Sequence, residues 1–259
     1  NTKVKVYVDS RDCVDCAIEF IKLHPEYKNY VMLLNLANAS HPGGGWKSGA
    51  TAQEEQLFRR SNYFQHISDN KYDSNRQWSY PIPLYGGLYS PNVIFFRHSE
   101  ENSNENGGPY ALMIEPIQIN CLAVAACQWP PVVPDPSRNE MILHPDYELI
   151  TRQKIHTIFS IAAAKSQKVL ILSAFGCGAF QNPPQHIARL FQEVLIQYQD
   201  YFHTIIFSVY THGAAASKYN YESFLDVFGD INGNGKGCLS STTLPSNSSQ
   251  LSKEETTTV

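Results

Sequence analysis

Three stretches of the chain are almost entirely apolar, and the segments between them repeat their apolar residues at helical spacing. The apolar stretches are residues 30–36, 169–172 and 205–210, and they are typical of strands that are covered on both faces in α/β proteins. Residues 3–8 alternate polar and apolar side chains, and this period of two predicts a half-buried strand. Shorter strands are predicted for residues 92–97, 112–114 and 121–126.

Helical periodicity predicts helices over residues 12–23, 145–165 and 219–228, and a further helix after Pro183. In that last helix the apolar residues recur at offsets of 0, 3, 4, 7 and 8 from Ile187, which places them on one buried face. Asn182 is predicted to cap this helix, with Pro183 at its first position. Thr51 is predicted to cap another helix, in which Glu54, three residues on, completes a capping box.

Strands that alternate with helices predict a three-layer α/β/α domain, and we expect a mixed, mostly parallel central sheet. Residues 68–109 are rich in Asn, Ser, Tyr, Pro and Gly, which predicts long loops around one short strand. From Gly229 onward the sequence turns to Gly, Asn, Ser and Thr, which cannot bury much apolar surface. We therefore expect one catalytic domain over residues 1–228 and a disordered polar tail over residues 229–259.

Composition narrows the classes of ligand. The 259 residues carry a net charge of −4 without a long block of Lys or Arg, which disfavours a broad electrostatic contact with nucleic acid. A small anion remains compatible, because backbone amides bind anions without cationic side chains. No apolar run approaches the ~18 residues that span a bilayer. The six cysteines are too few for a disulfide scaffold, and the nine histidines show no metal-binding spacing, so we expect no metal and no cofactor.

Two of the apolar strands run into glycine-rich loops that are each followed by a helix. Residues 33–36 lead into Gly43, Gly44 and Gly45, and residues 170–172 lead into Gly176-Cys177-Gly178. Ligands of open α/β sheets bind beyond the carboxyl ends of the strands, where glycines let backbone N–H groups approach closely. Neither loop has the spacing of a dinucleotide fingerprint or of a P-loop. Each could be a simple tight turn, but two in matching positions favour a ligand that bears phosphate.

The helix after the first loop begins with Gln53-Glu54-Glu55. Successive residues of a helix diverge by ~100°, so the two carboxylates are not expected to share one face. If Glu54 completes the capping box, Glu55 is free to point at the loop and do chemistry, and Gln53 can bond a sugar or a base. The alternative is that both glutamates only stabilise the helix dipole in its first turn.

The segment from Gly43 to Glu55, with seven residues between the glycines and Gln53, resembles the signature of the microbial type of poly(ADP-ribose) glycohydrolase, a macrodomain enzyme. Residues 35–39, 120–130 and 173–184 resemble other segments of that family: the strand end that contacts ribose, a core strand and the diphosphate loop. The likeness covers about residues 10–228. It implies a macrodomain fold with ADP-ribose bound between the two glycine loops.

The resemblance also implies a role for each matching residue. Glu55 would be the catalytic acid and base, Glu54 would orient it, and Gln53 and Asn38 would contact ribose hydroxyls. The glycines of the first loop would line the scissile ribose and the diphosphate. The second loop would wrap the diphosphate, and its last residue would pack on a ribose; these residues are Gly176, Cys177, Gly178, Ala179 and Phe180. At position 181, where the family usually has Gly, this chain has Gln181.

The implied reaction is hydrolysis of ribose–ribose O-glycosidic bonds in poly(ADP-ribose), with release of ADP-ribose. Adjacent glutamates cannot flank a bond as the two carboxylates of most glycosidases do, so Glu55 alone would protonate the leaving oxygen and then activate water. The substrate would be the polymer or ADP-ribosylated proteins. The adenine-stacking residue would come from the many aromatic residues between positions 63 and 96. We expect a monomer that binds neither membranes nor specific nucleic-acid sequences.

Three other functions fit the same residues. A binding module could hold ADP-ribose without cleaving it, the pocket could hydrolyse mono-ADP-ribosyl bonds or acyl-ADP-ribose esters, or the domain could be purely structural. Gln53-Glu54-Glu55 separates the enzyme from the binding module, which does not need these residues. Asn38-Ala39-Ser40 is a glycosylation sequon within the loop, where a glycan would obstruct the site. The sequon therefore favours an intracellular location, cytoplasmic or nuclear.

Overall fold

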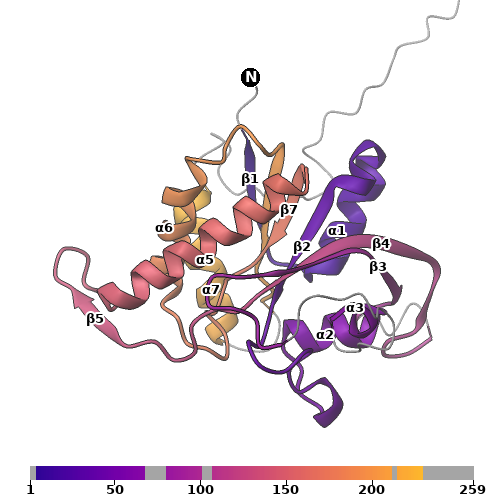
Figure 1. Cartoon of the computed structure of the whole chain (residues 1–259), viewed down its shortest axis with the longest axis horizontal. Helices are drawn as coiled ribbons and strands as arrows, with labels where there is room; N and C mark the ends of the chain where they lie inside the picture. The colour runs from indigo at the N-terminus through magenta and orange to yellow at the C-terminus, as the bar shows by residue number, and fades with distance from the viewer. Residues whose placement is uncertain (1–3, 68–79, 101–106, 212–214, 230–259) are drawn as a thin grey trace, which may run out of the picture.

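The computed structural model describes residues 4–67, 80–100, 107–211 and 215–229, and a six-stranded sheet lies at its centre (Figure 1). In spatial order its strands are β1 (Lys5–Asp9), β8 (Thr204–Ser208), β7 (Val169–Leu172), β2 (Val31–Leu36), β4 (Leu112–Val124) and β3 (Leu88–Arg97). Neighbouring strands are parallel except at one edge, where β3 runs antiparallel to β4. The predicted mixed, mostly parallel sheet is therefore confirmed.

Helices cover both faces of the sheet, so the domain has the three layers that the sequence predicts. One face carries α1 (Cys13–Leu23), α2 (Gln53–Arg60) and α3 (Tyr63–Ile67), and the other carries α5 (Pro145–Ala164), α6 (Pro184–Leu195) and α7 (Ala215–Phe228). Burial of a Leu, Ile or Phe side chain stabilises the fold by ~1.5–3 kcal/mol. The central strands contribute to both cores, because β2, β7 and β8 are apolar on both sides, as predicted.

Two predicted helix N-caps are wrong, because polar side chains expected to cap these helices have hydrogen-bond partners elsewhere in the fold. α2 has Ala52 rather than Thr51 at its N-cap, and no side chain caps it. α6 has Pro183 at its N-cap, and Asn182 makes no cap. Both polar side chains that the local pattern assigned to capping are used elsewhere: Glu54 binds the preceding loop, and Asn182 binds backbone carbonyls. By contrast, Asp12 caps α1 as an acidic N-cap should.

The antiparallel edge is longer than the sequence suggests. β3 begins at residue 88 rather than 92, and β4 is one strand over residues 112–124 where two short strands were expected. α7 begins four residues before the predicted start at Tyr219. A two-stranded hairpin, β5 (Val132–Asp135) and β6 (Glu140–Leu143), and two 3-10 helices, η1 (Pro25–Tyr30) and η2 (Trp46–Ser48), were not predicted.

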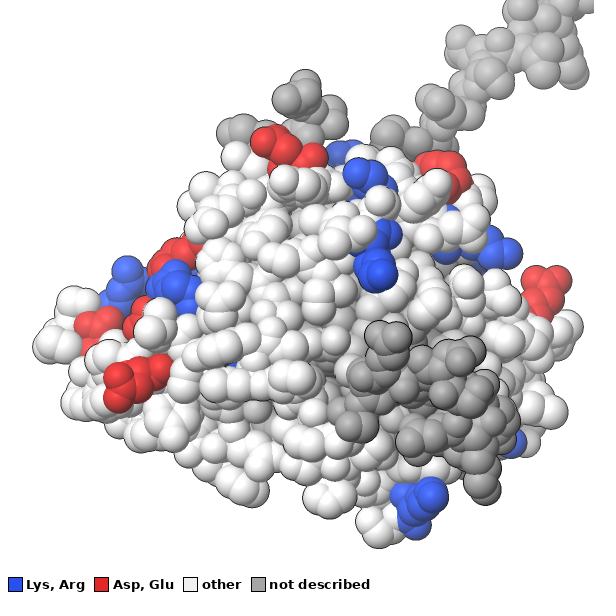
Figure 2. All heavy atoms as spheres, in the orientation of Figure 1, with Lys and Arg blue, Asp and Glu red and all other residues white. Residues whose placement is uncertain are grey.

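The charged residues are scattered on the face drawn in Figure 2, where Lys and Arg stand among Asp and Glu rather than in one patch. This agrees with the low net charge. No helix in the described ranges is both long enough and apolar enough to cross a bilayer. Residues 230–259 of the predicted tail lie outside the described residues, as do residues 68–79 and 101–106 of the predicted loop region 68–109.

Candidate active site

The loops that follow β2, β7 and β8 meet at the carboxyl-end edge of the sheet around a cavity of about 310 Å³. Parallel strands place their carboxyl ends together, which is why loops far apart in sequence converge here. Every predicted site residue except Gly43 and Cys177 lines the cavity. The ten that line it are Asn38, Gly44, Gly45, Gln53, Glu54, Glu55, Gly176, Gly178, Ala179 and Phe180. Both glycine loops therefore border one cavity.

Glu54 ties the first glycine loop to the start of α2. Its carboxylate accepts hydrogen bonds from the backbone N–H groups of Asn38 (2.7 Å) and Gly43 (3.1 Å), and from the side-chain amide of Asn35 (3.3 Å). Burial raises the pKa of Glu54 to about 7, although these N–H donors act in the opposite direction. Glu54 therefore orders the first glycine loop. The capping pattern had predicted that it would order the start of α2 instead.

Glu55 is also buried, but only one of its oxygens is occupied. Oε1 accepts the backbone N–H of Gly45 at 2.9 Å. Oε2 is shielded from solvent and has no hydrogen-bond partner among the described residues. A buried carboxyl oxygen without a partner is costly unless a ligand or a function uses it. The Glu55 carboxyl group is thus fixed by one oxygen, while the other has no hydrogen-bond partner in the described part of the chain.

The first glycine loop lets the backbone approach these two carboxylates. Gly44 has a φ of +54°, and a Cβ there would lie 2.3 Å from Oε1 of Glu55. The N–H groups of all three glycines are already used: Gly43 and Gly45 bind the two glutamates, and Gly44 binds the carbonyl oxygen of His41. The three glycines therefore position the carboxylates, and they offer no spare backbone N–H group to a diphosphate.

Gln53 and Asn38 have local partners of their own. The Gln53 side chain accepts the N–H of Leu36 at 2.9 Å and donates to the carbonyl of Leu34 at 2.7 Å, so it joins the start of α2 to the end of β2. The Asn38 carbonyl oxygen accepts two N–H groups within its own turn, at 2.9 and 3.0 Å. Both residues line the cavity, and their contacts with ribose remain predictions.

The second glycine loop supplies the backbone donors. Asn182 fastens this loop by donating to the carbonyls of Gly176 (3.0 Å) and Cys127 (2.8 Å). Across the described residues, the consecutive N–H groups of Gly178, Ala179 and Phe180 donate no hydrogen bond. Among the described residues no Lys, Arg or His lines the cavity, so an anion there would be held by such amides.

Residues on β8 and α7 complete the cavity, and sequence reasoning missed them. Val209 and Tyr210 lie just past β8, and Ser217 and Asn220 belong to α7. Asn220 also donates to the carbonyl of Cys177 at 3.5 Å, which links α7 to the second loop. The sequence does contain an indication of the residues after β8. The apolar strand predicted at 205–210 ends at the same edge of the sheet as the two strands that are followed by glycine loops.

A second cavity of about 440 Å³ adjoins the first on the side of α1 and α2. The two share Tyr210 and four other lining residues: Ala52, Gln53, Ser173 and Ser217. None of the described aromatic residues between positions 63 and 96 lines either cavity, and positions 68–79 lie outside the described residues. Together the cavities suit an elongated ligand that passes Tyr210.

The fold and site define a class of protein: an α/β/α domain with a macrodomain-like sheet, which offers backbone amides to an anion beside two buried glutamates. Within this class, residues 1–98 match the family described as "Microbial-type PARG, catalytic domain", where PARG stands for poly(ADP-ribose) glycohydrolase. That match includes β1, α1, β2, the first glycine loop and α2. Among curated proteins, none matches the sequence.

Solved structures extend the similarity beyond the matched segment. The poly(ADP-ribose) glycohydrolase from Thermomonospora curvata, bound to the inhibitor ADP-HPD, is 25% identical, with a TM-score of 0.65 over 86% of this chain and 78% of its own. The enzyme from Deinococcus radiodurans in complex with ADP-ribose is also 25% identical, with a TM-score of 0.65 over 88% of this chain and 85% of its own. The chain therefore resembles the microbial type of poly(ADP-ribose) glycohydrolase over most of its length, as its motifs predicted.

Proposed function

We propose that this chain is a poly(ADP-ribose) glycohydrolase, which hydrolyses ribose–ribose O-glycosidic bonds in poly(ADP-ribose) and releases ADP-ribose. One observation carries the proposal: Glu55 lines the same cavity as Gly178, Ala179 and Phe180, and one of its buried carboxyl oxygens has no hydrogen-bond partner among the described residues. A diphosphate on those amides would place the ribose next to it within reach of α2. The family match and the similar enzymes support the same activity.

In the proposed reaction Glu55 acts twice. The protonated carboxyl group donates to the leaving oxygen while the anomeric C–O bond breaks, and an oxocarbenium-like ribosyl cation forms. The negative diphosphate of the same ligand stabilises this cation. The ionised Glu55 then takes a proton from water as the water oxygen bonds to the anomeric carbon. The products are ADP-ribose and a polymer shortened by one unit, and Glu55 has its proton back.

Glu54 has a different part in this proposal. Each of its oxygens accepts at least one N–H group, so it holds the loop backbone in place instead of touching the reacting atoms. This fixes Gly44 and Gly45 against Glu55 and limits where the ribose can lie. The adenosine end of the ligand would extend past Tyr210 into the adjoining cavity, which is large enough for a base.

The partners follow from this activity. The substrate is poly(ADP-ribose) or an ADP-ribosylated protein, and the product is ADP-ribose. We also propose an intracellular location, cytoplasmic or nuclear, because a glycan on Asn38 would stand at the rim of the cavity that this residue lines. The monomeric state remains a prediction.

Incubation with purified poly(ADP-ribose) tests the proposal against a binding module and against enzymes of single ADP-ribose units. The wild-type protein should release ADP-ribose from the polymer, and Glu55→Ala should lose at least about 10³-fold in rate, since it removes both the acid and the base. Glu55→Ala should still bind ADP-ribose, as shown by calorimetry. If the wild-type protein retains the polymer and releases nothing, it is a binding module. Release only from mono-ADP-ribosylated protein or from an acyl ester would place it in the other class of hydrolase.

A further inference from the structure

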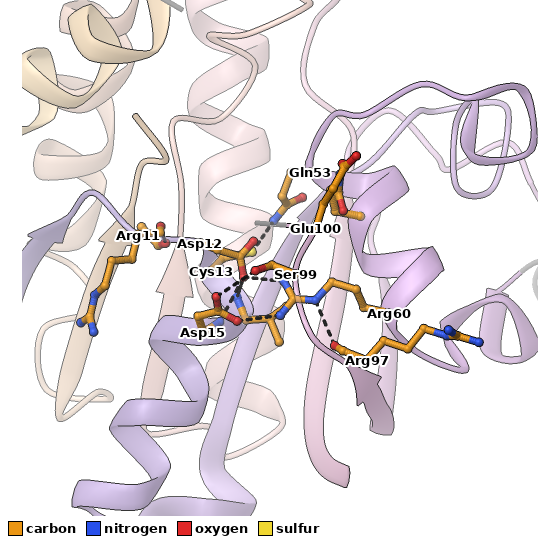
Figure 3. Close-up of polar contacts among 12 residues, drawn as sticks. Arg11, Asp12, Cys13, Asp15, Gln53, Arg60, Arg97, Ser99 and Glu100 are labelled. Carbon is orange, nitrogen blue, oxygen red and sulfur yellow. Dashed lines mark hydrogen bonds and ion pairs between the residues drawn. The ribbon is translucent and has the colours of Figure 1, made fainter. Parts of the chain in front are cut away.

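Arg60, the last residue of α2, is completely buried and makes three polar contacts with two neighbouring elements (Figure 3). Its two terminal nitrogens donate to the carboxylates of Asp12 and Asp15 on α1, each at 2.6 Å. Its Nε donates to the carbonyl oxygen of Arg97 at 3.2 Å, at the end of β3. The guanidinium group thus joins the end of α2 to the start of α1 and to the edge of the sheet.

This cluster is fixed by charge. Burial alone would lower the pKa of Arg60, but the two aspartates outweigh burial and raise it, so the guanidinium stays charged. Asp12 has a second structural role, because the same oxygen that binds Arg60 caps α1 by accepting the N–H groups of Val14 and Asp15. Removing one member of a buried ion pair costs several kcal/mol in general, since the remaining charge loses its partner. We call Arg60, Asp12 and Asp15 together the clamp. Its buried ion pairs resist displacement of α2.

The clamp holds the last residue of α2, the helix that carries Glu55. Arg60 lies five residues after Glu55, which is ~7.5 Å along a helix axis. The other end of α2 is held by Gln53, which binds the end of β2 and also donates to Sγ of Cys13 at 3.5 Å. α2 is thus fastened at both ends to the first turn of α1 (Figure 3). Glu55 lies between these two attachments in the sequence of α2.

We propose that Arg60 is a positioning residue for Glu55, an inference that rests on the proposed glycohydrolase activity. It sets the height and tilt of α2, and so the place of the Glu55 carboxyl group relative to the amides of residues 178–180. Arg60 lines neither cavity. Replacing Arg60 should lower the rate of bond cleavage rather than the affinity for ADP-ribose, because a shift of ~1 Å in a catalytic group can cost 10²-fold in rate.

The test compares Arg60→Met and Arg60→Lys with Arg152→Met, the matched control. Arg152 is on α5 and pairs with Glu148 and Glu193 at the surface, away from both cavities. We measure kcat and KM on poly(ADP-ribose), the dissociation constant of ADP-ribose, and thermal unfolding, at a temperature where every protein is folded. Arg60→Met should lose at least 10-fold in kcat with less than a threefold change in ADP-ribose affinity. Arg60→Lys should recover part of kcat, and Arg152→Met should keep kcat within twofold.

Asp15→Asn keeps the proposal testable if Arg60→Met does not fold. Asp15 lines neither cavity, and Asn preserves its shape while removing one charge from the clamp. It should lower kcat about threefold or more with unchanged affinity. Folded variants with full kcat, or a loss confined to ADP-ribose affinity, overturn the positioning role. A wild-type protein that releases no ADP-ribose would instead remove the proposed function itself.

Discussion

Replacing Gly44 with alanine tests the close approach of the first loop to Glu55. The new Cβ would lie 2.3 Å from Oε1 of Glu55, whereas ordinary contact begins at 3.4 Å. The loop backbone is tied to Glu54 and Glu55 by its own N–H groups, so the side chain with the greater freedom has to move. The Glu55 carboxyl group should therefore shift by roughly 1 Å and lose its hydrogen bond to Gly45.

The magnitudes separate the effect on rate from the effect on stability. A displacement of ~1 Å in a catalytic group costs about 10²-fold in rate, which corresponds to ~2.7 kcal/mol of activation free energy. Alanine at a positive φ of +54° adds strain of about 1–2 kcal/mol to the folded state. We expect Gly44→Ala to remain folded and to lose about 100-fold in kcat on poly(ADP-ribose).

Gly49→Ala is the matched control. Gly49 also has a positive φ, +92°, but a Cβ there meets no atom within 4 Å. Both variants should therefore unfold at a reduced temperature, Gly44→Ala at the lower one because of its close contact with Oε1, and only Gly44→Ala should lose kcat. The assay measures initial rates of ADP-ribose release alongside thermal unfolding. If Gly44→Ala keeps kcat within threefold of Gly49→Ala, the position of the Glu55 carboxyl group does not limit the reaction, and its catalytic role falls.

Two further predictions concern stability. Because burial raises the pKa of Glu54 from 4.5 to about 7, its stabilising contribution is complete below pH 4.5 and is lost as pH rises through 7. Between pH 4.5 and 7 the free energy of unfolding of the wild-type protein should fall by up to ~3 kcal/mol more than that of Glu54→Gln. Denaturant titrations at several pH values measure both, and an equal pH dependence in the two proteins would contradict this. Gly176→Ala should cost about 2–4 kcal/mol, since φ is +75° and its Cβ would lie 2.6 Å from Nδ2 of Asn182. Gly178→Ala meets no atom within 4 Å and should stay within ~0.5 kcal/mol of wild type in the same titrations; equal losses would refute the packing argument.

The sheet and the convergence of its loops could be predicted from the sequence. The runs at 30–36, 169–172 and 205–210 contain little but apolar residues, which indicates buried parallel strands. Because parallel strands end at the same edge of the sheet, the loops that follow them are expected to lie together. The same reasoning could have added Tyr210, which ends the third run and lines both cavities. It was missed because no glycine loop drew attention to that strand.

The partners of individual polar side chains could not be predicted. Around Thr51 and before Pro183, the sequence offers good capping residues, and local pattern alone favours caps. In the fold, Glu54 instead accepts N–H groups from residues 16 and 11 positions earlier, and Asn182 reaches the carbonyl of Cys127, 55 positions away. A cap competes with every other donor and acceptor that tertiary structure brings near, and the sequence does not show those competitors. The clamp at Arg60 was overlooked for the same reason.

The charges around the cavity favour catalysis over binding alone. Two buried carboxyl groups border a cavity to which the described part of the chain contributes no cationic side chain, yet its amides suit an anion. At an effective dielectric constant of 20, unit charges ~8 Å apart repel by about 2 kcal/mol, so an ionised glutamate beside a diphosphate weakens binding. A binding module gains nothing from this arrangement. An enzyme gains a carboxyl group that can donate its proton to the leaving oxygen, and whose ionised form then stabilises the ribosyl cation.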